Sequence, residues 1–388
     1  MNVWSELVGQ SEATEALRAA SSPRTAAGDE SSSMTHAWLI TGPPGSGRSN
    51  LAYAFASSLL CRFGGCGECP DCAQVAARSH PDLTVLATDR VVIAIDEVRK
   101  LVTSSAYSPS VSRYRVMVIE DADRMAERTS NVLLKALEEP PERTVWILCA
   151  PSEADLLPTI RSRVRSVRLK VPGIDDVAAL LERRDGVDAA TAERAARQAQ
   201  SHIGMAHRLA TNESARERRD ETLQIALRLR GVSDAVLGAA RLMEIAGEDA
   251  KAITVERDEA EREHTLRSLG VEPGGTVPPA LRSQLRVLEE DQKRRATRSL
   301  RDGLDRILVD LLSLYRDIVR LQLGAVGGVI NTEVLNEMNT LAGATTAAQT
   351  LGILDAIATA RHRIDANVSP VLALEAMLVV ASRRTVAA

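Results

Sequence analysis

The chain has 388 residues, of which 45% are hydrophobic and 26% are charged, and its formal net charge is -4 at pH 7. This length suits two or three domains with ordinary apolar cores, and the charge argues against a self-standing basic nucleic-acid binder. No apolar run approaches the ~20 residues of a membrane span, and the start lacks the regions of a secretion signal, so we expect a cytoplasmic protein.

A glycine-rich stretch near residue 45 organises the first part of the chain. The apolar run 37–40 predicts a strand before it, and the residues from Asn50 predict a helix after it. In that setting G-x-x-x-x-G-K-[ST] cradles phosphate, because backbone N–H groups turn inward and the helix N-terminus carries partial positive charge. The predicted nucleotide site consists of Gly42, Pro43, Pro44, Gly45, Ser46, Gly47, Arg48 and Ser49. Arg48 replaces the lysine of the motif, and its guanidinium is planar and bulkier.

Four of the five cysteines stand close together, directly after the helix that follows this loop. They are Cys61, Cys66, Cys69 and Cys72. Four thiolates at this spacing can wrap one tetrahedral ion and leave no position open, so we predict a structural Zn²⁺ site. A redox dithiol formed by Cys69 and Cys72 is the alternative. His80 is a further candidate ligand, which we interpret instead as a loop histidine before Pro81.

A second nucleotide-binding pattern follows at residues 114–123. An apolar run that ends at Ile119 is followed by Glu120 and Asp121, which is the Walker B pattern of an apolar strand ending in two carboxylates. In that pattern the first carboxylate holds Mg²⁺ and the second orients the attacking water. The usual order is Asp then Glu, so each carboxylate is displaced by one methylene, which matters for catalytic geometry of ~3 Å.

The pattern of expected strands and helices divides the chain into two parts near residue 172. Strands and helices alternate to residue 170, which predicts an α/β domain with a mostly parallel sheet that ends near Pro172-Gly173. The following residues predict helices alone. The charge-dense part between 250 and 300 has a Pro/Gly loop at 273–275, so we expect a helical hairpin there, with Lys293-Arg294-Arg295 on a solvated face.

Several motifs in combination resemble the bacterial clamp-loader subunits of the AAA+ class. They are Val8-Gly9-Gln10, His36 to Leu39, the glycine-rich loop, the cysteine insert, Asn131 to Pro141 and Ser162-Arg163. The match is dense over residues 5–170 and weaker beyond, where Asn367 to Glu375 resembles the last collar helix. The resemblance implies an α/β fold with three parts. These are a RecA-like AAA+ core over 1–172 with the cysteine module at 61–72, a helical lid over 173–238, and an all-α collar over 239–388.

The resemblance also implies a place in the DNA polymerase III holoenzyme. Clamp-loader subunits form an open ring through their collars, open a sliding clamp and close it on primed DNA. The expected partners are therefore the gamma/tau motor and delta subunits, the sliding clamp and, within the complex, primed DNA. The chain would then belong to a DNA-directed DNA polymerase whether or not it is itself an enzyme.

Three departures from the motor-subunit pattern concern ATP. Arg48 replaces the phosphate-binding lysine, the order of Glu120 and Asp121 is inverted, and Gly204 stands where motor subunits carry a lid arginine. Together they predict a subunit that does not hydrolyse ATP, and they leave open whether ATP binds. The alternatives are an active ATPase of the gamma/tau type, with Arg48 as a tolerated substitute, and a zinc-dependent DNA-binding module that kept the fold.

Arg163 is the residue to which the resemblance gives a role in chemistry, on a neighbouring subunit. In the Ser-Arg-Cys motifs of the family this arginine reaches the next subunit's ATP, where a guanidinium offsets charge that develops on the γ-phosphoryl group. Val164 stands here in place of the cysteine. Without this context, an arginine at the entrance of a strand is expected to form only a surface salt bridge.

Overall fold

The computed structural model describes residues 2–5, 7–21, 34–88, 92–268, 282–325 and 327–383. The chain forms two compact units, Met1–Thr211 and Asn212–Ala388, each with its own apolar core. Within the described ranges, no helix combines the length and apolar character that crossing a membrane requires.

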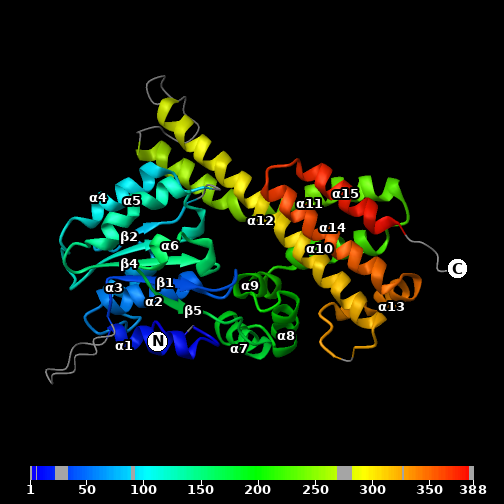
Figure 1. Ribbon diagram of the computed structural model, residues 1–388, viewed down its shortest axis with the longest axis horizontal. Coiled ribbons are helices and arrows are strands. Elements are labelled where there is room, and N and C mark those ends of the chain that lie inside the picture. Colours follow the sequence, from blue (N-terminus) through cyan, green and yellow to red (C-terminus); the bar gives the residue numbers. More distant parts are fainter. Residues whose placement is uncertain are drawn as a thin grey trace. The chain divides into compact units, whose positions relative to one another are not determined.

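A parallel sheet of five strands forms the centre of the first unit (Figure 1). Its strands are β1 (Ala37–Thr41), β2 (Leu83–Leu86), β3 (Arg115–Ile119), β4 (Thr144–Ala150) and β5 (Arg165–Arg168), in the order β2-β3-β4-β1-β5. All neighbouring strands run parallel, as predicted. β1 ends at Thr41, one residue beyond the predicted run 37–40, and β3 ends at Ile119 as predicted.

Helices cover both faces of this sheet (Figure 1). They are α1 (Ser11–Ser21), α2 (Arg48–Leu60), α3 (Pro70–Ala76), α4 (Ile95–Ser105), α5 (Glu127–Glu138) and α6 (Pro158–Arg161). Side chains alternate along β1, so Trp38 and Ile40 pack with α1 and α2, whereas Leu39 packs with α4, α5 and α6 on the opposite face. Strands that are buried on both faces are near-continuous apolar runs, which is why the sequence identified them.

Three short helices complete the first unit. They are α7 (Ile174–Asp185), α8 (Ala189–Gln198) and α9 (Ile203–Thr211), and they pack on one another. Small buried side chains such as Ala192, Ala196 and Ala206 allow this close packing. The chain that enters α9 contacts the glycine-rich loop, which brings these helices to the predicted nucleotide site.

The second unit is helical in its described residues, as predicted. Its helices are α10 (Glu213–Leu227), α11 (Val232–Ser268), α12 (Arg282–Gln322), α13 (Leu335–Ala344), α14 (Ala347–Asp365) and α15 (Pro370–Ser382). They share one core, to which α12 contributes apolar residues at helical spacing from Leu304 to Ile318. The long helices α11 and α12 pack together and form the expected hairpin, and the loop predicted at 273–275 lies outside the described residues.

Ion pairs join α11 to α12 in the charged part of the hairpin. Arg295 is 8% exposed, and its guanidinium donates to Asp258 at 2.5 Å and to Glu261 at 2.9 Å. The expected solvated face is therefore wrong for Arg295, because this side chain turns into the contact between the helices. Lys293 and Arg294 are exposed, in agreement with the expectation.

The division between the two units falls before α10. Leu223 and Ala226 of α10 belong to the core of the second unit. The Arg219 guanidinium, on the same helix, is buried against Asp310 at 3.0 Å and bonds to Asn331. The lid was expected to extend to residue 238, but α10 and the start of α11 pack with the C-terminal helices. The functional division into core, lid and collar stays a prediction.

Candidate functional site

The glycine-rich loop connects β1 to α2 as the sequence predicted. Gly45 and Gly47 have φ angles of +80° and +91°, which L side chains rarely adopt. The N–H of Gly42 lies 3.3 Å and 3.2 Å from the carbonyl oxygens of Ala150 and Pro151. These contacts fix the loop at the carboxyl ends of β1 and β4, where parallel α/β sheets bind their ligands.

Arg48 is directed at the loop to which it belongs. Its Nη1 donates to the carbonyl oxygen of Gly42 at 2.7 Å, and its Nη2 lies 3.9 Å from Oδ1 of Asp121. Only 13% of its side chain is exposed. A lysine in this position reaches the phosphates of a bound nucleotide. The Arg48 guanidinium is instead bonded to the carbonyl of Gly42, so a phosphate would have to displace this bond.

Three side chains hold the first Walker B carboxylate. Glu120 accepts hydrogen bonds from Ser49 at 2.8 Å and from Tyr53 at 2.5 Å, and it pairs with Arg78 at 3.2 Å. The Ser49 contact is expected, since these two groups share Mg²⁺ in a functional site. Burial and the hydrogen bond to Glu120 raise the pKa of Tyr53, so this phenol stays protonated and keeps donating. Tyr53 and Arg78 therefore compete with a metal ion for Glu120.

No motif in the sequence predicted either of these partners. Tyr53 lies one helical turn after Ser49 on α2, so helical spacing could have identified it. Arg78 comes after the cysteine module, and no pattern in the sequence pairs it with residue 120. Its guanidinium carbon lies 4.9 Å from the centre of the Tyr53 ring, so the two side chains support each other.

The segment before α9 lies against the glycine-rich loop. The N–H of Ile203 donates to the carbonyl oxygen of Gly45 at 3.1 Å. A Cβ atom added to Gly45 would lie 2.1 Å from Cγ of His202, which shows how closely the imidazole approaches the loop. The sequence did not predict these two contacts. Gly204, the residue at the place of the lid arginine, follows directly and offers no side chain to a phosphate.

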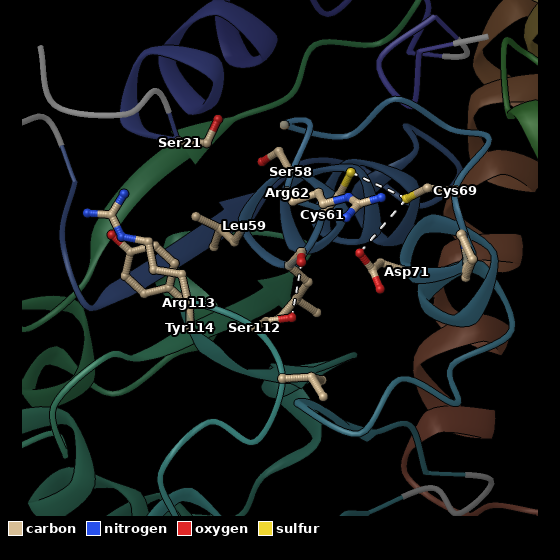
Figure 2. Close-up of a pocket in the computed structure, with 14 residues that line it drawn as sticks. Ser21, Ser58, Leu59, Cys61, Arg62, Cys69, Asp71, Ser112, Arg113 and Tyr114 are labelled. Carbon is tan, nitrogen blue, oxygen red and sulfur yellow. Dashed lines mark hydrogen bonds between the residues drawn. The ribbon is translucent and has the colours of Figure 1, made fainter.

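The four predicted metal ligands converge at the end of α2. Figure 2 shows the sulfur atoms of Cys61 and Cys69 facing each other, and these lie 3.5 Å apart. All four Sγ atoms, those of Cys66 and Cys72 included, lie within 4.8 Å of one another. Zn–S bonds of ~2.3 Å in a tetrahedron give sulfur–sulfur distances of about 3.8 Å. The four cysteines can therefore hold one metal ion.

Backbone N–H groups surround these sulfur atoms. Phe63 donates to the sulfur of Cys61 at 3.3 Å, and Gly67 donates to that of Cys72 at 3.3 Å. Burial disfavours the Cys61 thiolate, but backbone N–H groups outweigh burial and lower the pKa of Cys61 to about 6. A thiolate is the form that binds a metal, which the surroundings of Cys61 favour, whereas burial raises the pKa values of Cys69 and Cys72.

His80 has a structural place near the cysteines. Its Nδ1 accepts a hydrogen bond from the N–H of Asp82 at 3.1 Å, so a neutral ring carries its proton on Nε2. Nε2 lies 4.0 Å from the carboxylate of Asp71, which belongs to α3. The loop before β2 thus holds the His80 ring, and α3 lies near it, which agrees with the interpretation of His80 as a loop histidine.

Arg163 lies in the short connection between α6 and β5, and residues of its own chain hold it. Its Nη1 donates to the carbonyl oxygen of Thr159 at 2.7 Å and to Oγ of Ser162 at 3.1 Å, and its Nη2 pairs with Glu138. The side chain is 32% exposed, so a second chain could reach the guanidinium. Glu138 ends α5 and was not predicted as a partner. Its place in the Asn131 to Pro141 motif was the available signal.

Comparison with known proteins supports the motifs. Residues 25–172 match a family described as "DNA polymerase III, delta subunit". The chain is 39% identical over 144 residues to DNA polymerase III subunit delta' of Pseudomonas aeruginosa, a match that covers 36% of this chain and 44% of that protein. The delta' subunit of Haemophilus influenzae is 34% identical over 157 residues, which is 39% of this chain and 48% of that protein. The resemblance to delta-prime clamp-loader subunits is confirmed.

The chain is also similar to subunits named gamma/tau. DNA polymerase III subunit gamma/tau of Mycobacterium bovis is 32% identical over 185 residues, which is 46% of this chain and 31% of that protein. Among solved structures, a gamma subunit-related protein of Thermotoga maritima is 18% identical with a TM-score of 0.37, covering 89% of this chain and 93% of that chain. The chain spans less than half the length of the curated relatives named here. The predicted fold class is confirmed as far as an α/β core with a parallel sheet that is followed by helices.

Proposed function

We propose that this chain is a clamp-loader subunit of the DNA polymerase III holoenzyme that does not hydrolyse ATP itself. The match of residues 25–172 to the delta subunit family carries this proposal. The proposed partners follow from it: gamma/tau and delta-type subunits, a sliding clamp and, within the complex, primed DNA. Such a subunit works on the chromosome, which places it in the cytoplasm.

The contacts in the nucleotide site support the loss of hydrolysis. Arg48 is bonded to its own loop, and Glu120 is held by Tyr53 and Arg78. Both groups would have to break their bonds before phosphate and Mg²⁺ could take them. His202 and Ile203 limit approach to Gly45 in addition. Three independent obstacles make this site unsuited to turnover, since in-line attack on the γ-phosphoryl group depends on positioning.

Single-turnover ATPase measurements on the full chain test this part. We expect no hydrolysis by the wild type, and none by Arg48→Lys, because a restored lysine leaves Glu120 bound to Tyr53 and Arg78. Ser49→Ala serves as the control, since it removes the metal-binding hydroxyl of the motif. Hydrolysis by the wild type that disappears in Ser49→Ala would refute the proposal and favour the gamma/tau type of function. The relation to gamma/tau subunits makes that the second candidate.

Arg163 is the residue that we propose acts on a neighbour. In the isolated chain its guanidinium is paired with Glu138 at the surface. A half-exposed pair of this kind contributes only ~0.2–1 kcal/mol. A phosphate of a neighbouring subunit's ATP offers the same guanidinium a stronger, charge-assisted bond. Exchange of Glu138 for phosphate is therefore favourable, and the finger would be released when the neighbour holds ATP.

The cysteine cluster is the proposed site of a structural Zn²⁺ ion. Zinc would cross-link the end of α2 to α3, which supplies the stability that this glycine-rich insert lacks on its own. Elemental analysis of freshly purified protein tests it: we expect one zinc per chain, lost in Cys69→Ser and kept in Cys149→Ala. Cys149 is the matched control, because it is buried in β4 outside the cluster. Absence of zinc in the wild type would contradict the proposal.

A further inference from the structure

β5 is an edge strand, because it stands last in the strand order of the sheet. β5 pairs with β1 alone, and the N–H of Leu169 donates to the carbonyl oxygen of Thr41 at 2.7 Å. In a parallel ladder alternate residues bond to the same neighbour. Arg165, Val167 and Leu169 therefore face β1, and the backbone groups of Ser166 and Arg168 face outward.

The next residue in the outward series shows what this edge can bind. The side-chain amide of Gln10 accepts a hydrogen bond from the N–H of Lys170 at 3.1 Å and donates to its carbonyl oxygen at 2.8 Å. These two bonds are the ones that the backbone of an added strand would make. Among the described residues, nothing occupies the corresponding outer positions at Ser166 and Arg168.

A groove of about 1180 Å³ runs along this edge. Residues of α1, the 151–154 turn, the end of α6 and the start of the glycine-rich loop at Gly42 and Pro43 line it. The basic residues that line it are Arg161, Arg165, Arg168 and Lys170, and the acidic ones are Glu12 and Glu153. Lys170 pairs with Glu12 at 3.0 Å, so the remaining lining carries an excess of positive charge.

The two sides of the groove would meet different side chains of an added strand. Val167 and Leu169 belong to the core that α1 shares, and Ala13 and Ala16 of α1 line the groove. Side chains of a strand alternate, so Arg168 points to the opposite face, on which α6 packs. An added strand would place every second side chain against the small residues of α1. The alternate side chains of that strand would approach Arg161 and Arg168.

We propose that this groove binds an extended acidic segment of a partner protein, which adds a sixth strand to the sheet at β5. Backbone hydrogen bonds to Ser166 and Arg168 supply affinity, and the alternating side chains supply specificity, as in other cases of strand addition. The preferred segment alternates small apolar residues with Asp or Glu. Short edge strands that carry basic side chains resist pairing with neutral or basic strands. The same arginines therefore make the edge selective for an acidic one.

Fluorescence anisotropy with the full chain tests this proposal. The probe is a fluorescein-labelled peptide of about six residues that alternates Val and Glu, long enough to span a typical strand. The matched peptide alternates Val and Lys. We expect saturable binding of the Val-Glu peptide and no binding of the Val-Lys peptide. Equal binding of both peptides, or of neither, would overturn the proposal.

Two sets of variants separate strand addition from charge alone. Ser166→Pro removes an outward N–H, which an edge strand tolerates, whereas Ser166→Ala keeps it. We expect about tenfold weaker binding for Ser166→Pro, the effect of losing one hydrogen bond, and unchanged binding for Ser166→Ala. Arg161→Glu combined with Arg168→Glu should also weaken binding at least tenfold, and Arg183→Glu, an exposed residue on α7, should not.

Each contrary outcome rules the proposal out. Equal binding by Ser166→Pro and Ser166→Ala means that no strand is added. A dT oligonucleotide serves as a competing probe. If it binds more tightly than the peptide and its binding depends on the same arginines, the groove is a nucleic-acid surface instead. The molecular mass in solution can also be measured against protein concentration. If it rises for the wild type but not for Ser166→Pro, the occupant is a second copy of this chain. If Ser166→Pro loses its cooperative thermal transition, a Val-Glu peptide with N-methylated backbone nitrogens, which cannot donate to β5, tests strand addition instead and should bind about tenfold less tightly than the unmodified peptide.

Discussion

Replacement of Arg163 by alanine distinguishes two roles of this residue: an action on the ATP of a neighbouring subunit, and a surface salt bridge within its own chain. The change removes the ion pair to Glu138 and the hydrogen bonds to Thr159 and Ser162. The pair is 32% exposed on the arginine and 46% on the glutamate, so water screens it. Its loss is expected to lower the free energy of unfolding by no more than ~1 kcal/mol.

The expected effect on a neighbouring subunit is far larger. A trans-acting arginine in phosphoryl transfer contributes ~10³–10⁵ in rate. A change of ~1 kcal/mol in the stability of Arg163→Ala alters an equilibrium by a factor of about five. The effects expected from the two roles therefore differ by at least two orders of magnitude, so the rate of ATP hydrolysis distinguishes them clearly.

The assay is DNA-stimulated ATP hydrolysis by a clamp loader reconstituted with gamma/tau and delta-type subunits. Thermal unfolding of the variant alone and size-exclusion analysis of the assembled ring show that folding and assembly are intact. Arg183→Ala, at an exposed arginine on α7, is the control and should turn over ATP like the wild type. Unchanged hydrolysis in a ring that contains Arg163→Ala would show that Arg163 forms only the surface salt bridge.

Two further predictions concern carboxylates that the structure identified. Glu138→Gln keeps the shape but not the charge of the Arg163 partner, so ring ATPase should rise by up to about fivefold, the factor that corresponds to ~1 kcal/mol; a fall in turnover would contradict release of the finger. Asp82 is buried, which disfavours its charge, but N–H groups of Ser110, Val111 and Ser112 lower its pKa overall. Its folded pKa is thus below the unfolded one, so its contribution is present at neutral pH and is lost as acid titrates the folded group. Urea unfolding should show Asp82→Asn less stable by ~1–3 kcal/mol at pH 7 and less sensitive to acid than the wild type; equal slopes against pH would contradict this.

Local patterns allowed the framework to be predicted from the sequence. The glycine-rich loop, the strand before it, the strand that ends at Ile119 and the cysteine cluster were located from the sequence, because each depends on residues close together in the chain. A buried parallel strand needs an apolar run, and four sulfur ligands within a glycine-rich turn need only short-range closure. The identity of Arg48 also indicated an altered nucleotide site before any contact was known.

The tertiary structure alone showed how that site is altered and where Arg163 is held. Arg78 reaches Glu120, His202 reaches Gly45, and Glu138 reaches Arg163. Each pair joins segments that are separated in the sequence and meet only when the sheet and helices pack. Arg295 is a further example in the second unit. Its basic run predicted a solvated face, but its side chain bonds to Asp258 and Glu261 of the neighbouring helix. Spacing along the chain determines which residues share a helix or strand, but long side chains find their partners across elements, and packing decides those contacts.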